Sequence, residues 1–504
     1  METITDLIKG VSVPRMVKIR EVFDDTHIPV NMIADMVNAE LSREALGGQV
    51  KPGMRIAITC GSRGMSNNAV MAKAIVDFVK SKGAEPYIVP AMGSHGGATA
   101  EGQLQILKDY GITEETMGCP IKSSMDTVQI GLSGVRHQPV FMDKNASEAD
   151  GIILFNRIKP HTSFRGPYES GLMKMMAIGL GKQKGAESIH HQSPAIMHEL
   201  IEEYGRTFID NVPIIGGIAV IENAYDETYL IKGLTPQEII TEEPKLKELS
   251  YKTIAHILFD KCDVLVVDKI GKNISGDGMD PNISGRFVLP QYCSGGIQAE
   301  KCVILDITDE THGNAQGVGL AEVTTRRLVN RMKLEMTYPT GVTNTFLHLM
   351  KIPMIMDNDR EALQLALCCC PEAEDQNNMK MIRIPDTAHI EYIEISEGLL
   401  PLAKENPNIE ILTEPYDLPF DENGNLLKKG KHHLWGSRLF DQAQTAQNRR
   451  NYRSSRRRYN KRRQRIGLLR LIMSDMVLEV DPSFFIRLEK TTFLDKEDKK
   501  AILK

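Results

Sequence analysis

The sequence contains no run of about 18 or more consecutive apolar residues, the usual minimum for a membrane-spanning helix. Its opening stretch, METITDLIKGVSVPRMVKIR, also lacks the basic start, apolar core and small-residue cleavage site of a secretory leader. Apolar residues still make up 41% of the 504 residues, enough to bury the cores of two or three domains. We therefore expect a globular protein with a cytoplasmic location and no membrane partner.

Cysteine pairs of the CxxC type are absent, and the eight cysteines are scattered apart from one triplet. This excludes the usual zinc sites and a small disulfide framework, and it is typical of a reducing compartment. The triplet, Cys368 to Cys370, follows the helical pattern REALQLAL. We interpret it as small buried apolar side chains and not as a metal site.

The signatures of nucleotide-binding proteins and zinc proteases are incomplete. GLGKQKG at 179–185 is spaced G-x-G-x-x-x-G, follows no clear strand and lacks the ribose-binding acid at the usual offset, so a dinucleotide fold is not supported. It is not a P-loop, because Gln183 follows Lys182 where Ser or Thr is required. MHELIEE has no second histidine four residues after His198, which excludes the zinc-protease helix.

Short apolar runs rich in β-branched residues alternate with amphipathic stretches. MRIAITC leads through GSRGMSN into NAVMAKAIVDFVKSKG, and PYIVPAM leads through GSHGG into TAEGQLQILKDYG. Further strand candidates lie at 149–158, 213–224, 262–271 and 301–307. This order of strand, loop and helix is typical of a parallel sheet with crossover helices. We therefore predict an α/β fold whose functional residues lie in the loops after the strands.

A polar stretch, DENGNLLKKGKHH, breaks this alternation from residue 421. We place an N-terminal catalytic domain at 1–260, a second α/β domain at 261–430 and an arginine-rich helical tail at 431–504. The two domains are expected to consist of parallel-sheet βα units with the site in the cleft between them.

Histidine, lysine and arginine recur in glycine-rich or strand-end loops. GSRGMSN carries Arg63, AMGSHGGAT carries His95, KPHTSFRGPYESGLMK carries His161 and Lys174, and ESIHHQ carries His190. Each residue alone is most simply a solvated loop side chain. Together they predict a shared site, because loops after strands of one parallel sheet gather at one edge.

In order and character, residues 1 to about 430 resemble the nickel-pincer lactate racemases and their wider family of 2-hydroxy-acid racemases and epimerases. The resemblance implies that Arg63 binds a carboxylate or phosphate of substrate or cofactor and that His95 and His161 form an acid–base pair. It also implies that Lys174 holds a nickel-pincer nucleotide covalently and that His190 ligates the nickel. The sixteen residues from Lys174 to His190 match the family spacing.

The chemistry of such a reaction suits these residue types. A 2-hydroxy acid is hard to racemise by removing a proton from its unactivated carbon, and hydride transfer to an electron-poor pyridinium carbon is easier. Two histidines with pKa values near neutrality can then serve the hydroxyls of the two enantiomers. Imidazole suits square-planar nickel, and a guanidinium suits a carboxylate. The implied partners are a small 2-hydroxy acid and the enzymes that build the pincer cofactor.

The sequence departs from this family at three places. Cys60 stands where the family commonly has an acidic residue before the loop arginine, and the stretch from His161 to Lys174 is longer. The family's additional lysine and glutamine near the substrate have no clear match beyond Lys272 and Arg286. We therefore expect a 2-hydroxy acid other than lactate.

The tail has a different charge from the rest of the chain. Eleven Lys or Arg and no acid lie between Arg449 and Arg470, which leaves 50 basic against 66 acidic side chains, or −16, elsewhere. RRRYNKRRQRI and DPSFFIRLE resemble the arginine-rich bridge helix and the following lobe of type II CRISPR effector nucleases, where that helix grips guide-RNA phosphates. The resemblance implies an RNA contact by the tail, and a genomic or assembly fusion of unrelated parts is its simplest origin. The expected phosphate-binding residues are Arg449, Arg450, Arg453, Arg456, Arg457, Arg458, Lys461, Arg462, Arg463 and Arg465.

Two alternatives to an isomerase stay open. One is a non-catalytic α/β binding protein whose histidines only bond to their own loops. The other is a nucleic-acid-binding protein that acts through the basic tail. Salt-dependent RNA affinity would favour the latter, and isomerisation of a lactate-like acid would favour the enzyme.

Overall fold

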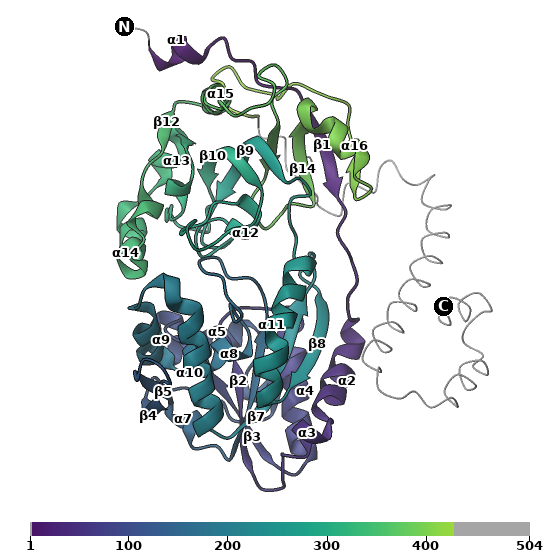
Figure 1. The fold of residues 1–504 in the computed structure, drawn as a ribbon, viewed down its shortest axis with the longest axis vertical. Coiled ribbons are helices and arrows are strands. Elements are labelled where there is room, and N and C mark those ends of the chain that lie inside the picture. Colours follow the sequence, from purple (N-terminus) through teal and green to yellow (C-terminus); the bar gives the residue numbers. More distant parts are fainter. Residues whose placement is uncertain (1–2, 428–504) are drawn as a thin grey trace, which may run out of the picture. The chain divides into compact units, whose positions relative to one another are not determined.

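The computed structural model describes residues 3–427, and the arginine-rich tail lies outside the described residues. Residues 3–427 form a five-stranded sheet, an eight-stranded sheet and a two-stranded hairpin (Figure 1). No helix in this part of the chain is both long enough and apolar enough to cross a membrane.

The first sheet has the strand order β3-β2-β6-β7-β8. Four of its strands run parallel, and β8 pairs with β7 in the opposite direction. The strands are β2 (Arg55–Cys60), β3 (Glu85–Pro90), β6 (Gly151–Arg157), β7 (Ile214–Glu222) and β8 (Thr228–Leu234). The hairpin consists of β4 (Thr127–Leu132) and β5 (Pro139–Asp143).

Helices cover both faces of this sheet, because alternate strand residues point to opposite sides. Along β6, Ile152 and Leu154 join one apolar core, whereas Ile153 and Phe155 join the other. The helices of this half are α2 (Val30–Leu41), α3 (Glu44–Gly47), α4 (Asn68–Ser81), α5 (Ala100–Asp109), α6 (Glu114–Met117), α7 (Lys144–Ser147), α8 (Leu172–Lys174), α9 (Lys182–His190), α10 (Met197–Asn211) and α11 (Pro236–Thr253).

The second sheet has the order β12-β11-β10-β9-β13-β14-β1-β15. It is parallel from β12 to β13 and antiparallel from β13 to β15. The strands are β1 (Met16–Glu21), β9 (Lys261–Ile270), β10 (Gln298–Ile307), β11 (Val323–Thr325), β12 (Met354–Met356), β13 (Met381–Ile384), β14 (Tyr392–Ser396) and β15 (Ile409–Ile411). The helices are α1 (Ile4–Ile8), α12 (Pro281–Ser284), α13 (Arg326–Arg331), α14 (Leu334–Asn344), α15 (Asp359–Cys368) and α16 (Leu400–Glu405).

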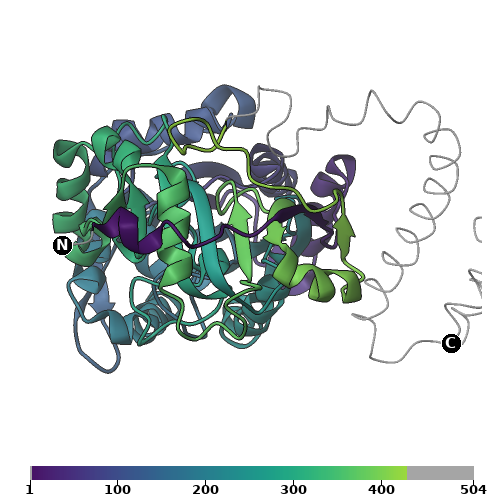
Figure 2. The same cartoon turned by 90° about the horizontal axis from the view of Figure 1, so that it is seen from above.

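The chain begins in the second sheet before it builds the first. Figure 2 shows the N-terminal segment, in purple, crossing the green elements of the second sheet and ending in β1. Residues 1–260, which the sequence suggested as one domain, thus include a strand of the second sheet. The return to that sheet comes at β9, close to the expected boundary at 260.

The α/β prediction is confirmed, with one difference. The second sheet is mixed, because β14, β1 and β15 add antiparallel strands to one side.

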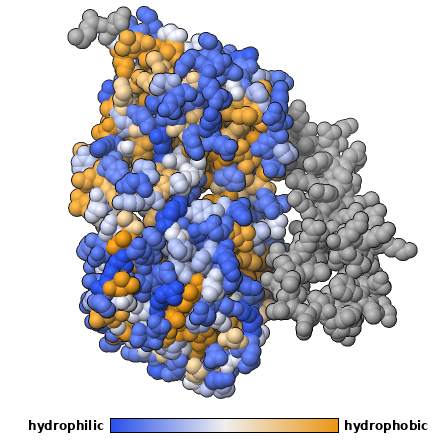
Figure 3. All heavy atoms as spheres, viewed as in Figure 1, coloured by the Kyte–Doolittle hydropathy of each residue, from blue (hydrophilic) through white to orange (hydrophobic). Residues whose placement is uncertain are grey.

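The prediction for the cysteine triplet is wrong in part, because Cys370 is buried while Cys368 and Cys369 are exposed at the end of α15. Apolar side chains also reach the surface over α14, including Val342 at 71% exposure (Figure 3).

Candidate active site

Three loops of the candidate site follow neighbouring parallel strands of the first sheet. Arg63 follows β2, His95 follows β3 and His161 follows β6, and these strands lie in the order β3-β2-β6. The loops emerge together because parallel strands end at the same edge. The first two loops are in direct contact through a hydrogen bond between the Ser62 hydroxyl and Nδ1 of His95.

Lys174 and His190 come from the helical segment after the His161 loop. Lys174 ends α8, a π-helical turn (η2, Met175–Leu180) follows, and His190 ends α9. The Lys174 amine lies 5.2 Å from the centroid of the Phe164 ring, which itself lies 4.1 Å from the His161 ring. Among residues 3–427, no hydrogen bond or ion pair reaches this amine. The structure thus places Lys174 next to the second acid–base candidate.

The start of α8 combines a glycine with a buried carboxylate. Gly171 has φ +106°, and a Cβ at this position would lie 2.7 Å from Oε1 of Glu243. Oε2 of Glu243 accepts hydrogen bonds from the Leu172 amide at 2.8 Å and the Met173 amide at 3.3 Å. Burial raises the pKa of Glu243 to about 8. This cap fixes the direction of the short helix that carries Lys174.

Burial lowers the pKa values of the three histidines and of Lys174. The pKa of His95 falls to about 4, with further lowering by Arg63 and Lys174, and that of His161 falls well below 6.5. The pKa of His190 is also lowered, by burial and then by Lys174. For Lys174, burial followed by Arg63 lowers the pKa to about 7. At neutral pH the three imidazoles are therefore uncharged, and a large share of the Lys174 amine is unprotonated.

His95 and His190 are exposed as whole residues. The protein atoms around their rings nevertheless shield them enough for desolvation to be the largest cause of their lowered pKa values. The His95 ring is also held by its hydrogen bond with the Ser62 hydroxyl. The direction of the shifts agrees with the surrounding positive charge, which comes from Arg63 and Lys174 for His95. These rings can therefore meet a ligand without further unfolding of the loops.

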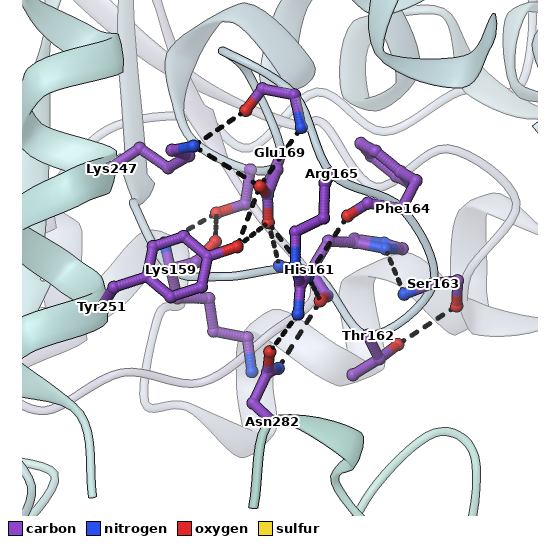
Figure 4. Close-up of polar contacts among 12 residues, drawn as sticks. Lys159, His161, Thr162, Ser163, Phe164, Arg165, Glu169, Lys247, Tyr251 and Asn282 are labelled. Carbon is purple, nitrogen blue, oxygen red and sulfur yellow. Dashed lines mark hydrogen bonds and ion pairs between the residues drawn. The ribbon is translucent and has the colours of Figure 1, made fainter. Parts of the chain in front are cut away.

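The His161 loop is folded around a buried carboxylate (Figure 4). Glu169, fully buried, accepts hydrogen bonds from the His161 amide at 2.8 Å and the Tyr251 hydroxyl at 2.8 Å. The Arg165 guanidinium donates to the His161 carbonyl at 2.6 Å and to Oδ1 of Asn282 at 2.7 Å. Because Asn282 lies on α12, this arginine ties the loop to an element beside the second sheet.

The same loop sets the tautomer of His161. The Ser163 amide donates to Nδ1 at 3.1 Å, so that nitrogen carries no proton and the neutral ring is protonated at Nε2. His161 can become a base at Nε2 only by giving up the Ser163 contact. The ring therefore starts as a hydrogen-bond donor toward a ligand oxygen.

Lys159 is a charged residue of the site that the sequence interpretation missed. Burial lowers the pKa of its amine to about 8, followed by repulsion from Arg157, and Arg63 contributes as well. In the described part of the chain, no hydrogen bond or ion pair is made by the Lys159 amine or by Arg63. Its place directly before Pro160 and His161 could have indicated it. An excess of unpaired cations favours a negatively charged ligand.

The two basic residues considered after β9 have different positions. The Lys272 amine donates to the Gly276 carbonyl at 2.6 Å, and a Cβ at Gly276 would lie 3.7 Å from the Arg63 guanidinium. Arg286 instead forms an ion pair of 2.9 Å with Glu322. Lys272 thus faces the site, whereas Arg286 stabilises the start of β10 through its bond to the Ala299 carbonyl.

The residues present fit a metal that brings most of its own ligands. Residues 3–427 contain no group of three or more His, Cys, Asp or Glu side chains that could hold a metal ion. His190 alone offers one imidazole nitrogen beside an unbonded amine at Lys174. This donor set suits an organic cofactor that attaches to the amine and supplies the remaining donors to the metal.

Comparisons with known proteins match two separate parts of the chain. Residues 50–232 match the model of a domain of unknown function, DUF362, and residues 449–481 match the bridge helix of the CRISPR-associated endonuclease Cas9. Part of the chain is similar in structure to the lactate racemase apoprotein from Thermoanaerobacterium thermosaccharolyticum, with a TM-score of 0.47 and 16% identity. That match covers 74% of this chain and 98% of the other.

Curated relatives match a short part of the chain. Cas9 of Listeria innocua is 39% identical over 95 residues, and Cas9 of Streptococcus mutans is 43% identical over 95 residues. Each match covers 18% of this chain, and the chain spans only 7% of the length of either relative. The resemblance of the tail to the bridge-helix region is confirmed, and the tail residues named from the sequence lie outside the described part.

Proposed function

We propose that residues 1 to about 430 form an isomerase that racemises or epimerises a 2-hydroxy acid with a nickel-pincer nucleotide. One observation carries the proposal: Arg63, His95, His161, Lys174 and His190 come from separate segments and form one electrostatic cluster. The expected location is the cytoplasm, and the expected partners are the enzymes that build the cofactor.

The attachment point is the Lys174 amine. A covalent bond from lysine requires an unprotonated nitrogen, and a pKa near 7 supplies one at neutral pH. His190 would provide the protein's ligand to nickel, since neutral imidazole is a ligand for this ion. When bound, the cofactor supplies an electron-poor carbon that accepts and returns the substrate's hydride.

The remaining residues act on the substrate directly. Arg63, which has no ion pair in the described part, would bind the substrate carboxylate in a two-pronged contact. His95 and His161 would hold and move the hydroxyl proton, one for each enantiomer. His161 enters as an Nε2–H donor, so it takes up a proton there only after releasing the Ser163 amide. Lys159 would add positive charge that favours an anionic substrate.

The test is a measurement of the covalent bond and the metal. Produced beside the enzymes that build the pincer nucleotide, the chain should gain a mass adduct at Lys174 and about one nickel ion. His190→Ala should keep the adduct and lose most of the nickel, because it removes a ligand and not the attachment point. Lys174→Ala should lose both, whereas His191→Ala serves as the matched control and should lose neither.

A chain that stays unmodified and nickel-free, under conditions that load an authentic lactate racemase, would overturn this proposal. The body would then be a binding protein with an anion site.

A second function rests on the tail. Eleven Lys or Arg within Arg449–Arg470, together with the bridge-helix match, favour binding of RNA phosphates. Affinity of the full chain for RNA should fall steeply with salt, and a chain ending at Gly430 should lose it. Equal affinity of both chains would exclude the tail as the RNA-binding part.

A further inference from the structure

A buried glutamine holds the backbone of the His95 loop. Gln103, on α5, is fully buried, and its amide nitrogen donates to the Gly93 carbonyl at 3.0 Å and to the His95 carbonyl at 3.2 Å. The amide oxygen faces the other way and accepts a hydrogen bond from the Lys182 amine at 2.8 Å. One side chain thus uses both ends, and the loop carbonyls would otherwise lack these donors.

Lys182, the other partner of Gln103, is the first residue of α9. Its side chain is fully buried, and the amine also donates to the Pro90 carbonyl at 2.6 Å and pairs with Asp143 at 3.2 Å. Pro90 ends β3, the strand that leads into the His95 loop. The Lys182 amine therefore stabilises that loop in two ways. It donates directly to the carbonyl at the end of β3, and it bonds to Gln103, which in turn bonds to the loop.

The helix that Lys182 begins ends at His190. A helix of this length is a stiff spacer of about 12 Å, at 1.5 Å per residue. Its first residue is tied to the loop of the first acid–base candidate, and its last residue is the candidate metal ligand. A hydrogen-bond network inside the core thus links the backbone of the His95 loop to the first residue of the helix that ends at His190.

We propose that Gln103 and Lys182 are positioning residues that hold the His95 loop and the His190 helix in a fixed relation to each other. Both side chains are fully buried, and they act through the backbone of the loop and the start of α9. Their role as positioning residues for catalysis rests on the function proposed above. The geometric part of the inference needs no substrate or cofactor.

The experiment compares Gln103→Met with Gln105→Met in the full chain without cofactor. Gln105 lies on the same helix and is exposed, and its side chain donates to Asp109, so it is a matched control. Gln103→Met keeps the length of the side chain but removes both donors to the loop. Amide hydrogen exchange of His95 and Ala98 should rise by about tenfold or more, while exchange in the β2 strand stays unchanged. The ring signals of His95 in ¹⁵N-histidine spectra should shift, and those of the distant His137 should not.

A second pair of variants tests the lysine. Lys182→Met alone would leave Asp143 buried without its counter-charge, so it is made together with Asp143→Asn. The double variant should again raise exchange of the His95 amide and should also shift the ring signals of His190. Lys184→Met, on the exposed side of α9, is the control and should shift neither.

These outcomes decide the inference. If Gln103→Met lowers the melting temperature but leaves loop exchange and the His95 signals as in the parent, the residue only fills the core and the proposal is wrong. In an active holoenzyme, Gln103→Met should lower kcat by about tenfold and leave KM within about twofold. A parent chain without any isomerase activity would defeat the proposed function, while the exchange and ring signals would still test the linkage.

Discussion

Replacing Lys174 with Met should stabilise the protein, because burial of the Lys174 amine destabilises its charged form in the folded state. Its pKa falls from 10.5 to about 7, first because of burial. That difference of about 3.5, at 1.36 kcal/mol for each pKa unit, corresponds to about 5 kcal/mol at pH 6. Relaxation of the loop and entry of water reduce this value, so we expect a gain of about 2–5 kcal/mol in the free energy of unfolding. Met fits the space because its side chain is long, flexible and apolar.

The sign of the pH dependence follows from proton binding. The unfolded chain holds the Lys174 proton up to about pH 10.5, whereas the folded chain releases it near pH 7. Between these values the unfolded state binds more protons, so parent stability rises with pH. The gain from Lys174→Met should therefore be larger at pH 6 than at pH 9, where the same pKa difference corresponds to about 2 kcal/mol before relaxation reduces it. Denaturant unfolding at both pH values measures it, with Lys184→Met as the exposed control.

An equal gain at pH 6 and pH 9 would show that packing, and not charge, limits the parent. No gain at pH 6 would show that the amine is solvated or paired in solution. Either result would refute the argument that Lys174 is poised for bond formation by burial.

Three further predictions concern other parts of the chain. His95→Gln and His161→Gln should each lower turnover by about a hundredfold in at least one direction with unchanged nickel content, and parent rates in both variants would exclude the acid–base pair. Oε2 of Glu21 has no hydrogen-bond partner in the described part, and burial raises the pKa of this residue to about 8. The free energy of unfolding should therefore fall as the pH rises from 4.5 to 8, because only the folded state keeps the Glu21 proton over that range. Glu21→Gln should flatten this loss in unfolding experiments at pH 5 and 8.5, and an unchanged slope would contradict it. A chain ending at Gly430 should keep the cooperative melt of the parent, because composition and charge change near residue 430 and few contacts should cross a boundary of this kind, and an insoluble truncated chain would disprove this.

The sequence predicted the first sheet well because its signals are local. The runs at 54–60 and 86–92 became β2 and β3, and the amphipathic stretches after them became α4 and α5. β1 could not be placed in the second sheet, because its partners in β14 and β15 lie more than 370 residues away. The antiparallel side of that sheet depends on such distant pairings, which hydrophobic periodicity does not encode.

The loop residues of the site could be predicted, and their supports could not. Arg63, His95 and His161 stand after recognisable strands, where chemistry gathers in parallel sheets. Glu169, Glu243 and Gln103 are polar residues inside otherwise ordinary segments, and only the fold shows that they are buried and bonded to those loops. The exposed Cys368 and Cys369 show the reverse error, in which cysteines at the end of α15 were interpreted as buried apolar side chains.

Lys182 shows most clearly why a motif needs its surroundings. GLGKQKG, which contains this lysine, resembles a phosphate-binding loop in composition. Its spacing excludes that function and suggests no other. The fold gives it a buried carboxylate from β5 and an amide oxygen from α5, so its charge is used inside the protein. Lys159 and Lys174 lack such partners in the described part, and their lowered pKa values follow from this lack together with burial. A lysine satisfied by the core holds the site together, and a lysine left unsatisfied beside it is available to a ligand.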